Sequence, residues 1–170
     1  MELDFLANNK PTIPTIAKWY FEEWGYLMKE NSLDEVEQNL HAYLNSDKIP
    51  LIILAKEGEV VLGVAQLKFH EMDIYPEKEH WLGGVYVANE YRGNKIAEKI
   101  ILEVISTAKK LGVHKLHLQT EDLSGGLYSR LGWEPIEQVN YRGNNVLVME
   151  KTIAGQSDVR RTTDSAAGDL

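Results

Sequence analysis

The chain has 170 residues, a net charge of −8 and no cysteine. This length suggests one domain with a sizeable core, and the acidic balance argues against a nucleic-acid partner, which requires a basic surface. The negative charge mildly favours cationic acceptors, and the alternative is that it only keeps the protein soluble. Without cysteine there are no disulfides and no thiolate chemistry, which fits a reducing cytoplasm. The N-terminus lacks a signal-peptide pattern and the apolar runs are too short to span a bilayer, so we expect a cytoplasmic protein that makes no membrane contact.

The N-terminal half begins with helical patterns and continues with strands. Apolar residues at spacings of four, four and three predict a helix over residues 11–24 with the core stripe Ile13, Ala17, Phe21 and Trp24. Ser32 and Glu35 form a capping box, which predicts a second helix from there to about Leu44. The strands predicted in this half cover residues 51–56, 60–70 and 80–88, with a weaker one at 3–6.

The C-terminal half opens with the clearest helix of the chain, which follows Gly93. A strand over residues 113–120, a short helix over 124–131 and a hairpin complete the pattern. The hairpin strands are predicted over residues 134–141 and 146–152. This order predicts an α/β fold, an α+β mixed sheet layered with helices, in one domain over residues 1–153. Residues 154–170 show no periodicity and are expected to form a disordered tail.

The segment from Val85 to Ala97 is the most informative part of the chain. An apolar strand enters a turn that holds Arg92 and Gly93, and the long helix follows at once. The first N–H groups of a helix lack intrahelical acceptors, so such a turn can bind an anion, and Gly93 lets the backbone approach it closely. The patterns of a P-loop and of a dinucleotide-binding turn are both absent.

This segment resembles the pyrophosphate-binding pattern Q/R-x-x-G-x-G/A of the GNAT superfamily, the acetyl-CoA-dependent N-acetyltransferases. Arg92 and Ala97 match the ends of the pattern, and Lys95 stands where the family usually has its inner glycine. Residues 127–134 resemble a second family segment, L-Y-x-x-L-G-F/W, at about the family's distance along the chain. The resemblance implies a mostly antiparallel central sheet, flanked by helices, that splays between its fourth and fifth core strands.

The resemblance also implies acetyl-CoA as the co-substrate. Its pyrophosphate would bind mainly to backbone groups of Arg92, Gly93, Asn94, Lys95, Ile96 and Ala97. A backbone N–H near Val85, Tyr86 or Val87 would polarise the thioester carbonyl as a one-armed oxyanion hole. We include Ser124 among the cofactor-binding residues and expect it to cap the short helix. Lys95 adds a Cβ to the turn but also a positive charge beside the phosphates.

The resemblance implies that Tyr128 is the general acid, since a tyrosine at this position protonates the departing CoA thiolate in the family. A phenol has a pKa near 10 and keeps its proton at neutral pH, so it is available as an acid. The alternative is a tyrosine that only packs against the cofactor.

The general base stays open. The strand positions that carry a base in several family members match Trp81 and Gly83, and neither side chain takes a proton. Glu22, Glu23 and Asp73 are candidates, as is a chain of water molecules.

The first helix also supplies candidates for the acceptor site. Trp19, Glu22, Glu23 and Tyr26 lie off the predicted core stripe and would present an aromatic, acidic wall to a cationic amine. The alternative is an ordinary solvated helix face. No metal is expected, because His114 and His117 point to opposite faces of a predicted strand.

Three functions follow from these patterns. The first, implied by the resemblance, is an N-acetyltransferase that moves an acetyl group to a primary amine of a small-molecule or peptide acceptor. The transfer is expected to be direct, because no cysteine is present to form a thioester intermediate. The second is a non-catalytic acyl-CoA-binding sensor, and the third is an α/β domain with an unrelated binding function. A homodimer that pairs through residues 146–149 is a further possibility.

Overall fold

The computed structural model describes residues 1–153, and the tail predicted over residues 154–170 lies outside these described residues. One sheet of seven strands has the order β1-β2-β3-β4-β5-β7-β6. The strands are β1 Glu2–Phe5, β2 Leu51–Glu57, β3 Val60–Phe69, β4 His80–Val87, β5 Lys115–Thr120, β6 Glu134–Tyr141 and β7 Asn144–Thr152. The α-helices are α1 Ile13–Trp24, α2 Leu33–Leu40, α3 Ile96–Lys110 and α4 Gly126–Arg130. The predicted α/β fold with a mostly antiparallel sheet is confirmed.

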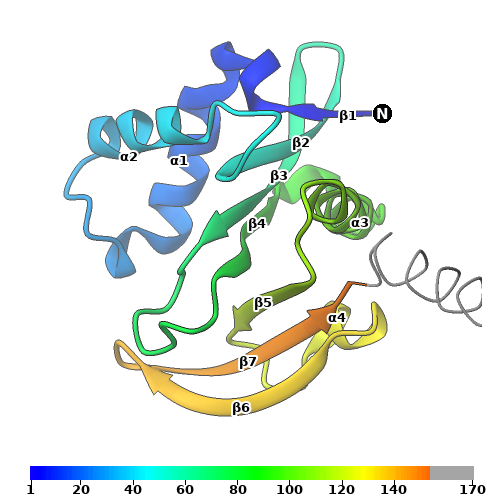
Figure 1. Ribbon diagram of the computed structural model, residues 1–170. Coiled ribbons are helices and arrows are strands. Elements are labelled where there is room, and N and C mark those ends of the chain that lie inside the picture. The colour runs from blue at the N-terminus through cyan, green and yellow to red at the C-terminus, as the bar shows by residue number, and fades with distance from the viewer. Residues whose placement is uncertain (154–170) are drawn as a thin grey trace, which may run out of the picture.

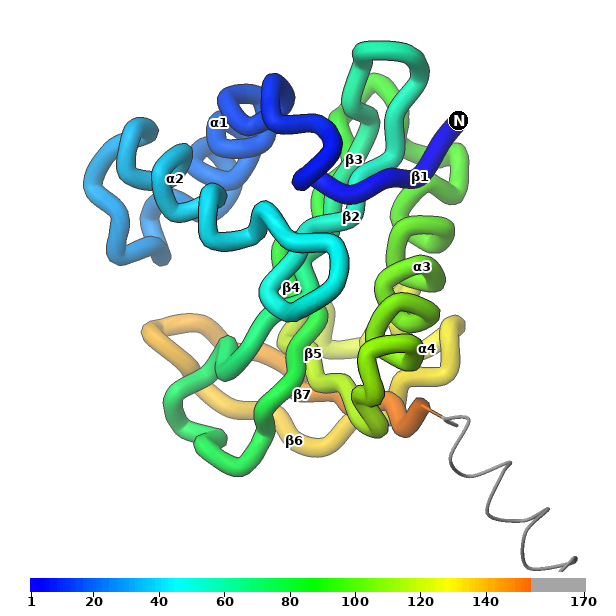
Figure 2. Tube along the Cα trace, turned by 45° about the horizontal axis from the view of Figure 1, so that its top comes forward, coloured from blue at the N-terminus to red at the C-terminus, as the bar shows by residue number. Residues whose placement is uncertain are grey.

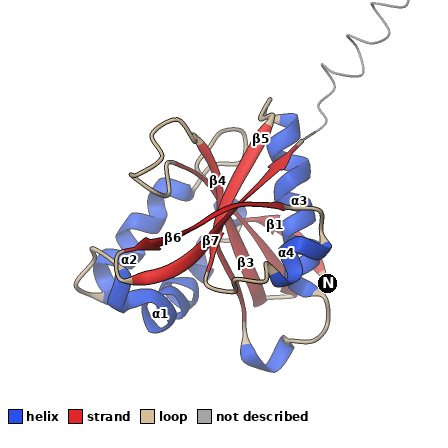
Figure 3. Cartoon of the chain, turned by 90° about the horizontal axis from the view of Figure 1, so that it is seen from below, coloured by secondary structure: helices blue, strands red, loops and turns tan. Residues whose placement is uncertain are grey.

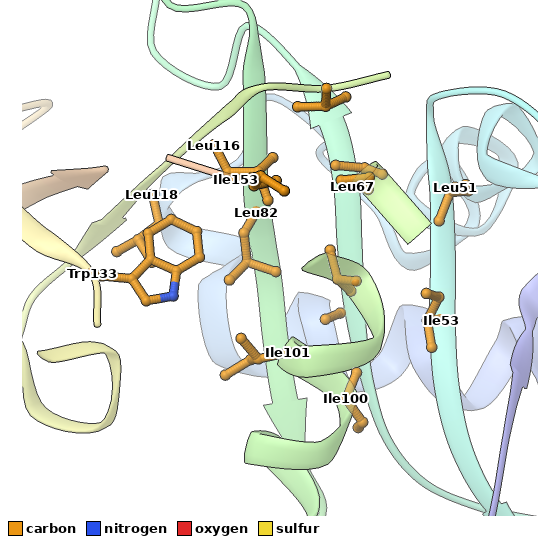
Figure 4. Packing of buried hydrophobic residues seen from close by; sticks show 14 of the residues in the cluster. Leu51, Ile53, Leu67, Leu82, Ile100, Ile101, Leu116, Leu118, Trp133 and Ile153 are labelled. Atoms are coloured by element: carbon orange, nitrogen blue, oxygen red, sulfur yellow. The ribbon is translucent and has the colours of Figure 1, made fainter. Parts of the chain in front are cut away.

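The sheet lies between two layers of helices, with α1 and α2 on one face and α3 on the other (Figures 1 and 2). Strand β2 is buried on both faces, which explains its unbroken apolar run. Successive side chains of a strand point to opposite faces, so Leu51 and Ile53 join the core under α3 while Ile52 and Leu54 join the core under α1 and α2. Figure 4 shows Ile100 and Ile101 of α3 in the first of these cores.

The helix boundaries differ from the prediction where local packing decides them. Ser32 Oγ accepts a hydrogen bond from the Glu35 N–H at 3.3 Å, so the predicted cap exists, but α2 ends at Leu40 and a 3₁₀ turn follows. In α1 the buried stripe is Ile13, Ile16, Ala17 and Tyr20, and the predicted members Phe21 and Trp24 are only partly buried. The buried stripe is therefore rotated about the helix axis toward Ile16 and Tyr20 relative to the predicted one.

Strands β4 and β5 form the one parallel pair of the sheet, and they separate soon after they meet. Their register holds a single pair, Trp81 with His117, whereas every other neighbouring pair is antiparallel and more extensive. The carboxyl ends of both strands therefore diverge, and the predicted splay between the fourth and fifth core strands is confirmed. The sheet with its flanking helices is seen from below in Figure 3.

The segment that was predicted to pair two copies lies inside the sheet. Residues 146–149 belong to β7, which pairs with β5 on one side and with β6 on the other. Their backbone groups are already used in the sheet, so this segment is not an open edge for a second copy. The edges of the sheet are β1 and β6. Within residues 1–153, no helix is both long enough and apolar enough to cross a membrane.

Candidate active site

The turn before α3 leaves a row of backbone N–H groups free. Gly93 and Lys95 both adopt left-handed backbone conformations, with φ of 85° and 60°, and Lys95 is the N-cap of α3 without a side-chain cap. No described residue accepts a hydrogen bond from the N–H groups of residues 93–98. These donors converge at a helix N-terminus, which is a suitable site for an anion such as a pyrophosphate.

Two side chains hold this turn in shape. Arg92 Nε donates to the Val87 carbonyl oxygen at 2.9 Å, and its guanidinium lies 5.3 Å from the centre of the Tyr86 ring. Asn94 Nδ2 donates to the Tyr91 carbonyl oxygen at 3.0 Å. Arg92 and Asn94 are therefore occupied with the backbone, which leaves the N–H groups to face a ligand.

Strand β4 carries a bulge at the point where it leaves β5. Val64 pairs with Tyr86 and Gln66 pairs with Gly83, so β4 has one residue more than β3 between these pairs. The extra residue falls at Gly84, whose φ of 54° is left-handed. A Cβ at Gly84 would lie 2.7 Å from the Tyr20 hydroxyl oxygen. Glycine is therefore required here both by the left-handed backbone and by the lack of space for a side chain.

A cavity of about 740 Å³ lies beside this bulge and extends to α4. It is bounded by the end of α1 and the segment before α2, by the diverging strands β4 and β5, and by the turn between β6 and β7. Its aromatic residues are Tyr20, Trp24, Tyr43, Tyr128 and Tyr141, and its carboxylates are Glu30, Glu71, Asp73, Glu121 and Asp122. The volume is in the range of small-molecule sites, and the lining suits a cationic ligand.

Tyr128 lies on α4 and faces this cavity. Its ring packs edge-on against Trp133, with 6.2 Å between the ring centres. Burial and, to a smaller extent, the negative charge of Glu71 raise the pKa of Tyr128 to about 12. The phenol is therefore protonated throughout the neutral range, which is the state that a proton donor requires.

The structure places Ser124 elsewhere than predicted. The N-cap of α4 is Gly125, and Ser124 lies one residue earlier on the surface, outside the cavity lining. Its hydroxyl donates to Asp122 Oδ1 at 2.6 Å and accepts from the Gly126 N–H at 3.3 Å. Ser124 thus shapes the loop between β5 and α4 and does not cap the helix.

The acceptor wall predicted on α1 lies apart from this cavity. None of its four residues lines the cavity: Trp19 packs on Tyr86 at 5.2 Å between ring centres, Glu22 and Glu23 are exposed, and Tyr26 is 72% exposed. The rotation of the α1 stripe turns Tyr20 and Trp24 to the cavity instead. Of the predicted base candidates, Asp73 lines the cavity, where its carboxylate accepts from the Tyr141 hydroxyl at 3.1 Å.

Sequence reasoning missed Glu71 and Lys68, which meet in the cavity wall. Lys68 Nζ lies 3.1 Å from Glu71 Oε1, and the two side chains are 23% and 20% exposed. Burial alone would lower the pKa of Lys68, but the charge of Glu71 and the Tyr43 phenol raise it above its ordinary value. No sequence pattern marks this pair, although the Gly83-Gly84 dipeptide inside a strand is a signal for a bulge and a close approach. Among residues 1–153, no group of His, Asp or Glu side chains is arranged to hold a metal ion.

Comparison with known proteins identifies the family. The model of the acetyltransferase (GNAT) family matches residues 13–133, so the chain belongs to the GNAT acetyltransferase family. An aminoglycoside 6'-acetyltransferase type Ii is 19% identical, with a TM-score of 0.70 over 92% of this chain and 99% of that one. A ribosomal-protein-alanine N-acetyltransferase from Brucella melitensis is 21% identical, with a TM-score of 0.69 over 89% and 99%.

A third similar structure is the Salmonella typhimurium protein yncA, which was determined with its cofactor acetyl-CoA. It is 17% identical, with a TM-score of 0.70 over 89% of this chain and 93% of that one. At such low identity these structures establish the shared fold. A comparison with curated protein sequences finds no match.

Proposed function

We propose that residues 1–153 form an N-acetyltransferase domain that moves the acetyl group of acetyl-CoA directly to a primary amine of a small-molecule or peptide acceptor. The observation that carries this proposal is a cavity lined together by Tyr128, the β4 bulge and a set of carboxylates. Family membership and the free N–H groups of residues 93–98 support the choice of donor.

In the proposed reaction the N–H groups of residues 93–98 bind the pyrophosphate of acetyl-CoA. The acetyl-bearing arm then lies in the gap between β4 and β5, where it can pair with the exposed strand edge, and a backbone N–H of Val85, Tyr86 or Val87 polarises the thioester carbonyl. The amine enters through the aromatic, acidic cavity and attacks the carbonyl carbon. Tyr128 gives its proton to the sulfur as the C–S bond breaks.

The cavity lining supports a cationic acceptor. Its five carboxylates outnumber the lysine and arginine side chains of the lining, which are Lys29, Lys68 and Arg142. One of those cations, Lys68, is paired with Glu71, and another, Arg142, lies 3.7 Å from Asp73. An ammonium group would therefore meet a negative field and aromatic faces on which it can rest.

Release of free thiol from acetyl-CoA tests the proposal. The protein is incubated with acetyl-CoA and polyamines, aminoglycosides, amino acids or N-terminal peptides, and a thiol-reactive dye reports CoA; the absence of cysteine removes the protein's own background. Turnover with one acceptor class is the expected result. Binding of acetyl-CoA without turnover of any amine would favour an acyl-CoA sensor, and no binding at all would overturn both functions.

A further inference from the structure

Strand β4 offers the cavity no side chain that can take a proton. Its residues there are Leu82, Gly83, Gly84 and Val85, and the two glycines leave the strand surface bare beside the bulge. An acceptor amine is an ammonium ion at neutral pH and must lose protons to form an amide. A proton acceptor for it therefore has to come from another element.

The bare surface at Gly83 is covered by the carboxylate of Glu71. A Cβ placed on Gly83 would lie 2.8 Å from Glu71 Oε2, so the carboxylate occupies the space that a side chain at position 83 would fill. Glu71 comes from the segment between β3 and β4, and the left-handed backbone of His70, with φ of 47°, begins this segment. The Glu71 carboxylate thus packs over Gly83 of β4, although Glu71 itself belongs to the loop between β3 and β4.

The two oxygens of Glu71 have different surroundings. Oε1 lies 3.1 Å from Lys68 Nζ, and this contact anchors the carboxylate. Oε2 accepts no hydrogen bond from any residue in the described range. One oxygen is therefore fixed and the other is available to a ligand in the cavity.

The other cavity carboxylates are engaged or lie in the open. Asp73 is 74% exposed and holds Tyr141 and Arg142. Asp122 accepts from the backbone and the hydroxyl of Ser124, and Glu30 accepts from Asn39. Glu121 lies exposed at the end of β5. Glu71 is the carboxylate that is both held in place and set next to the β4 bulge.

From this geometry we infer that Glu71 is the general base of the acetyl transfer, a role that rests on the proposed function. The bound ammonium loses one proton to solvent, and the neutral nitrogen forms the C–N bond. Its second proton passes to Glu71 Oε2, directly or through one water, and then to solvent. The electron pair of the C–S bond goes to sulfur, which takes the Tyr128 proton, and Tyr128 is reprotonated from solvent. One proton is released for each acetyl group transferred.

The position of Glu71 over Gly83 allows a test by relocation. Glu71→Gln is expected to lower kcat by about a hundredfold or more, with acetyl-CoA affinity unchanged, which is the usual effect of removing a positioned base. Glu71→Ala combined with Gly83→Asp returns a carboxylate to nearly the same space from β4 and is expected to recover at least about tenfold over Glu71→Ala alone. Glu77→Gln is the matched control, because Glu77 is in the same segment, is 65% exposed and does not line the cavity.

The possible outcomes distinguish a failure of the Glu71 assignment from a failure of the proposed acetyltransferase function. If the wild type transfers acetyl groups and folded Glu71→Gln keeps kcat within about threefold, Glu71 is not the base. A rise in the acceptor KM at constant kcat would likewise overturn it, since it would show that Glu71 only binds the ammonium. If Glu71→Gln melts early, the relocated variant decides, and lack of recovery in a folded, acetyl-CoA-binding protein overturns the assignment. A wild type that binds acetyl-CoA and turns over no amine overturns the proposed function, and the base role with it.

Discussion

The hydroxyl of Tyr20 donates a hydrogen bond to the carbonyl oxygen of Gly84 at 2.8 Å and so ties α1 to the bulge of β4. The phenol is almost completely buried, and burial is the main reason that its pKa is raised well above the usual range. The bulge is therefore held by a neutral, buried donor that comes from the helix on the far side of the cavity.

Tyr20→Phe removes this donor and leaves the Gly84 carbonyl without it. We expect the free energy of unfolding to fall by about 1 kcal/mol, the typical net contribution of one hydrogen bond, because the partly buried Gly84 carbonyl lines the cavity. Urea unfolding measures the change. Tyr26→Phe, at a tyrosine that is 72% exposed, is the control and should stay within about 0.5 kcal/mol of the wild type. Equal stability of the two variants would show that the Tyr20 bond contributes nothing net.

Tyr128→Phe tests the proton donor of the proposed reaction. We expect kcat to fall more than about tenfold while the affinity for acetyl-CoA changes little, because the hydroxyl acts in the transition state. Steady-state rates with an acceptor found by thiol release, together with calorimetric binding of acetyl-CoA, measure both quantities. An unchanged kcat would remove Tyr128 from the mechanism and leave it a packing role against Trp133.

Lys95 adopts a left-handed conformation, which costs a side-chain-bearing residue about 1–2 kcal/mol. Lys95→Gly is expected to raise the free energy of unfolding by about 1 kcal/mol, whereas Lys95→Ala keeps the strain and gains nothing. Both variants remove the positive charge, so both should bind CoA several-fold more weakly if the ammonium contacts the phosphates. Thermal unfolding and calorimetry separate these effects. A stabilised Lys95→Ala would contradict the argument from backbone strain.

His117 makes stability depend on pH. Its side chain is almost fully buried against Trp81. Burial is the largest cause that lowers the pKa of His117, and the positive charges of Lys78 and Lys115 lower it further. The Glu150 carboxylate, 3.3 Å away, raises the pKa but does not cancel the decrease. The unfolded chain therefore binds a proton at His117 before the folded chain does as pH falls. The contribution of neutral His117 to stability is complete above the unfolded pKa of about 6.5 and is lost below it.

Replacing His117 by Phe keeps an aromatic contact with Trp81 and removes the titration. We expect the urea midpoint of the wild type to fall more between pH 7.5 and pH 5 than that of His117→Phe. The other titrating groups are common to both proteins, so the difference between the two curves reports His117. Parallel curves would mean that the histidine has the same pKa in the folded and unfolded chains.

The local elements were predictable because their signals lie within a few neighbouring residues. The apolar period of α3, the capping box of Ser32 and the β2 run are all local patterns, and the structure has each of them. The turn at Arg92 and Gly93 was predictable for the same reason, since a strand, a glycine and a helix in succession define its backbone. Tyr128 was found through its motif, and the structure places it in the cavity.

The acceptor side of the cavity was not predictable in this way. Which side of α1 faces the cavity depends on how the helix rotates against the sheet, and this rotation turned Tyr20 and Trp24 inward in place of Trp19 and Tyr26. Glu71 is an ordinary loop residue in the sequence, and its relation to Gly83 exists only after β3 and β4 have paired.

Short-range patterns of side chains and backbone conformation were sufficient to predict the elements, their order, the turn before α3 and, through two motifs, the family. The tertiary structure alone decided which strands lie at the edges of the sheet, where β4 bulges and which carboxylate lies over Gly83. Those features arise from contacts between residues far apart in the chain, and the free energy of such contacts is set by packing against the whole core.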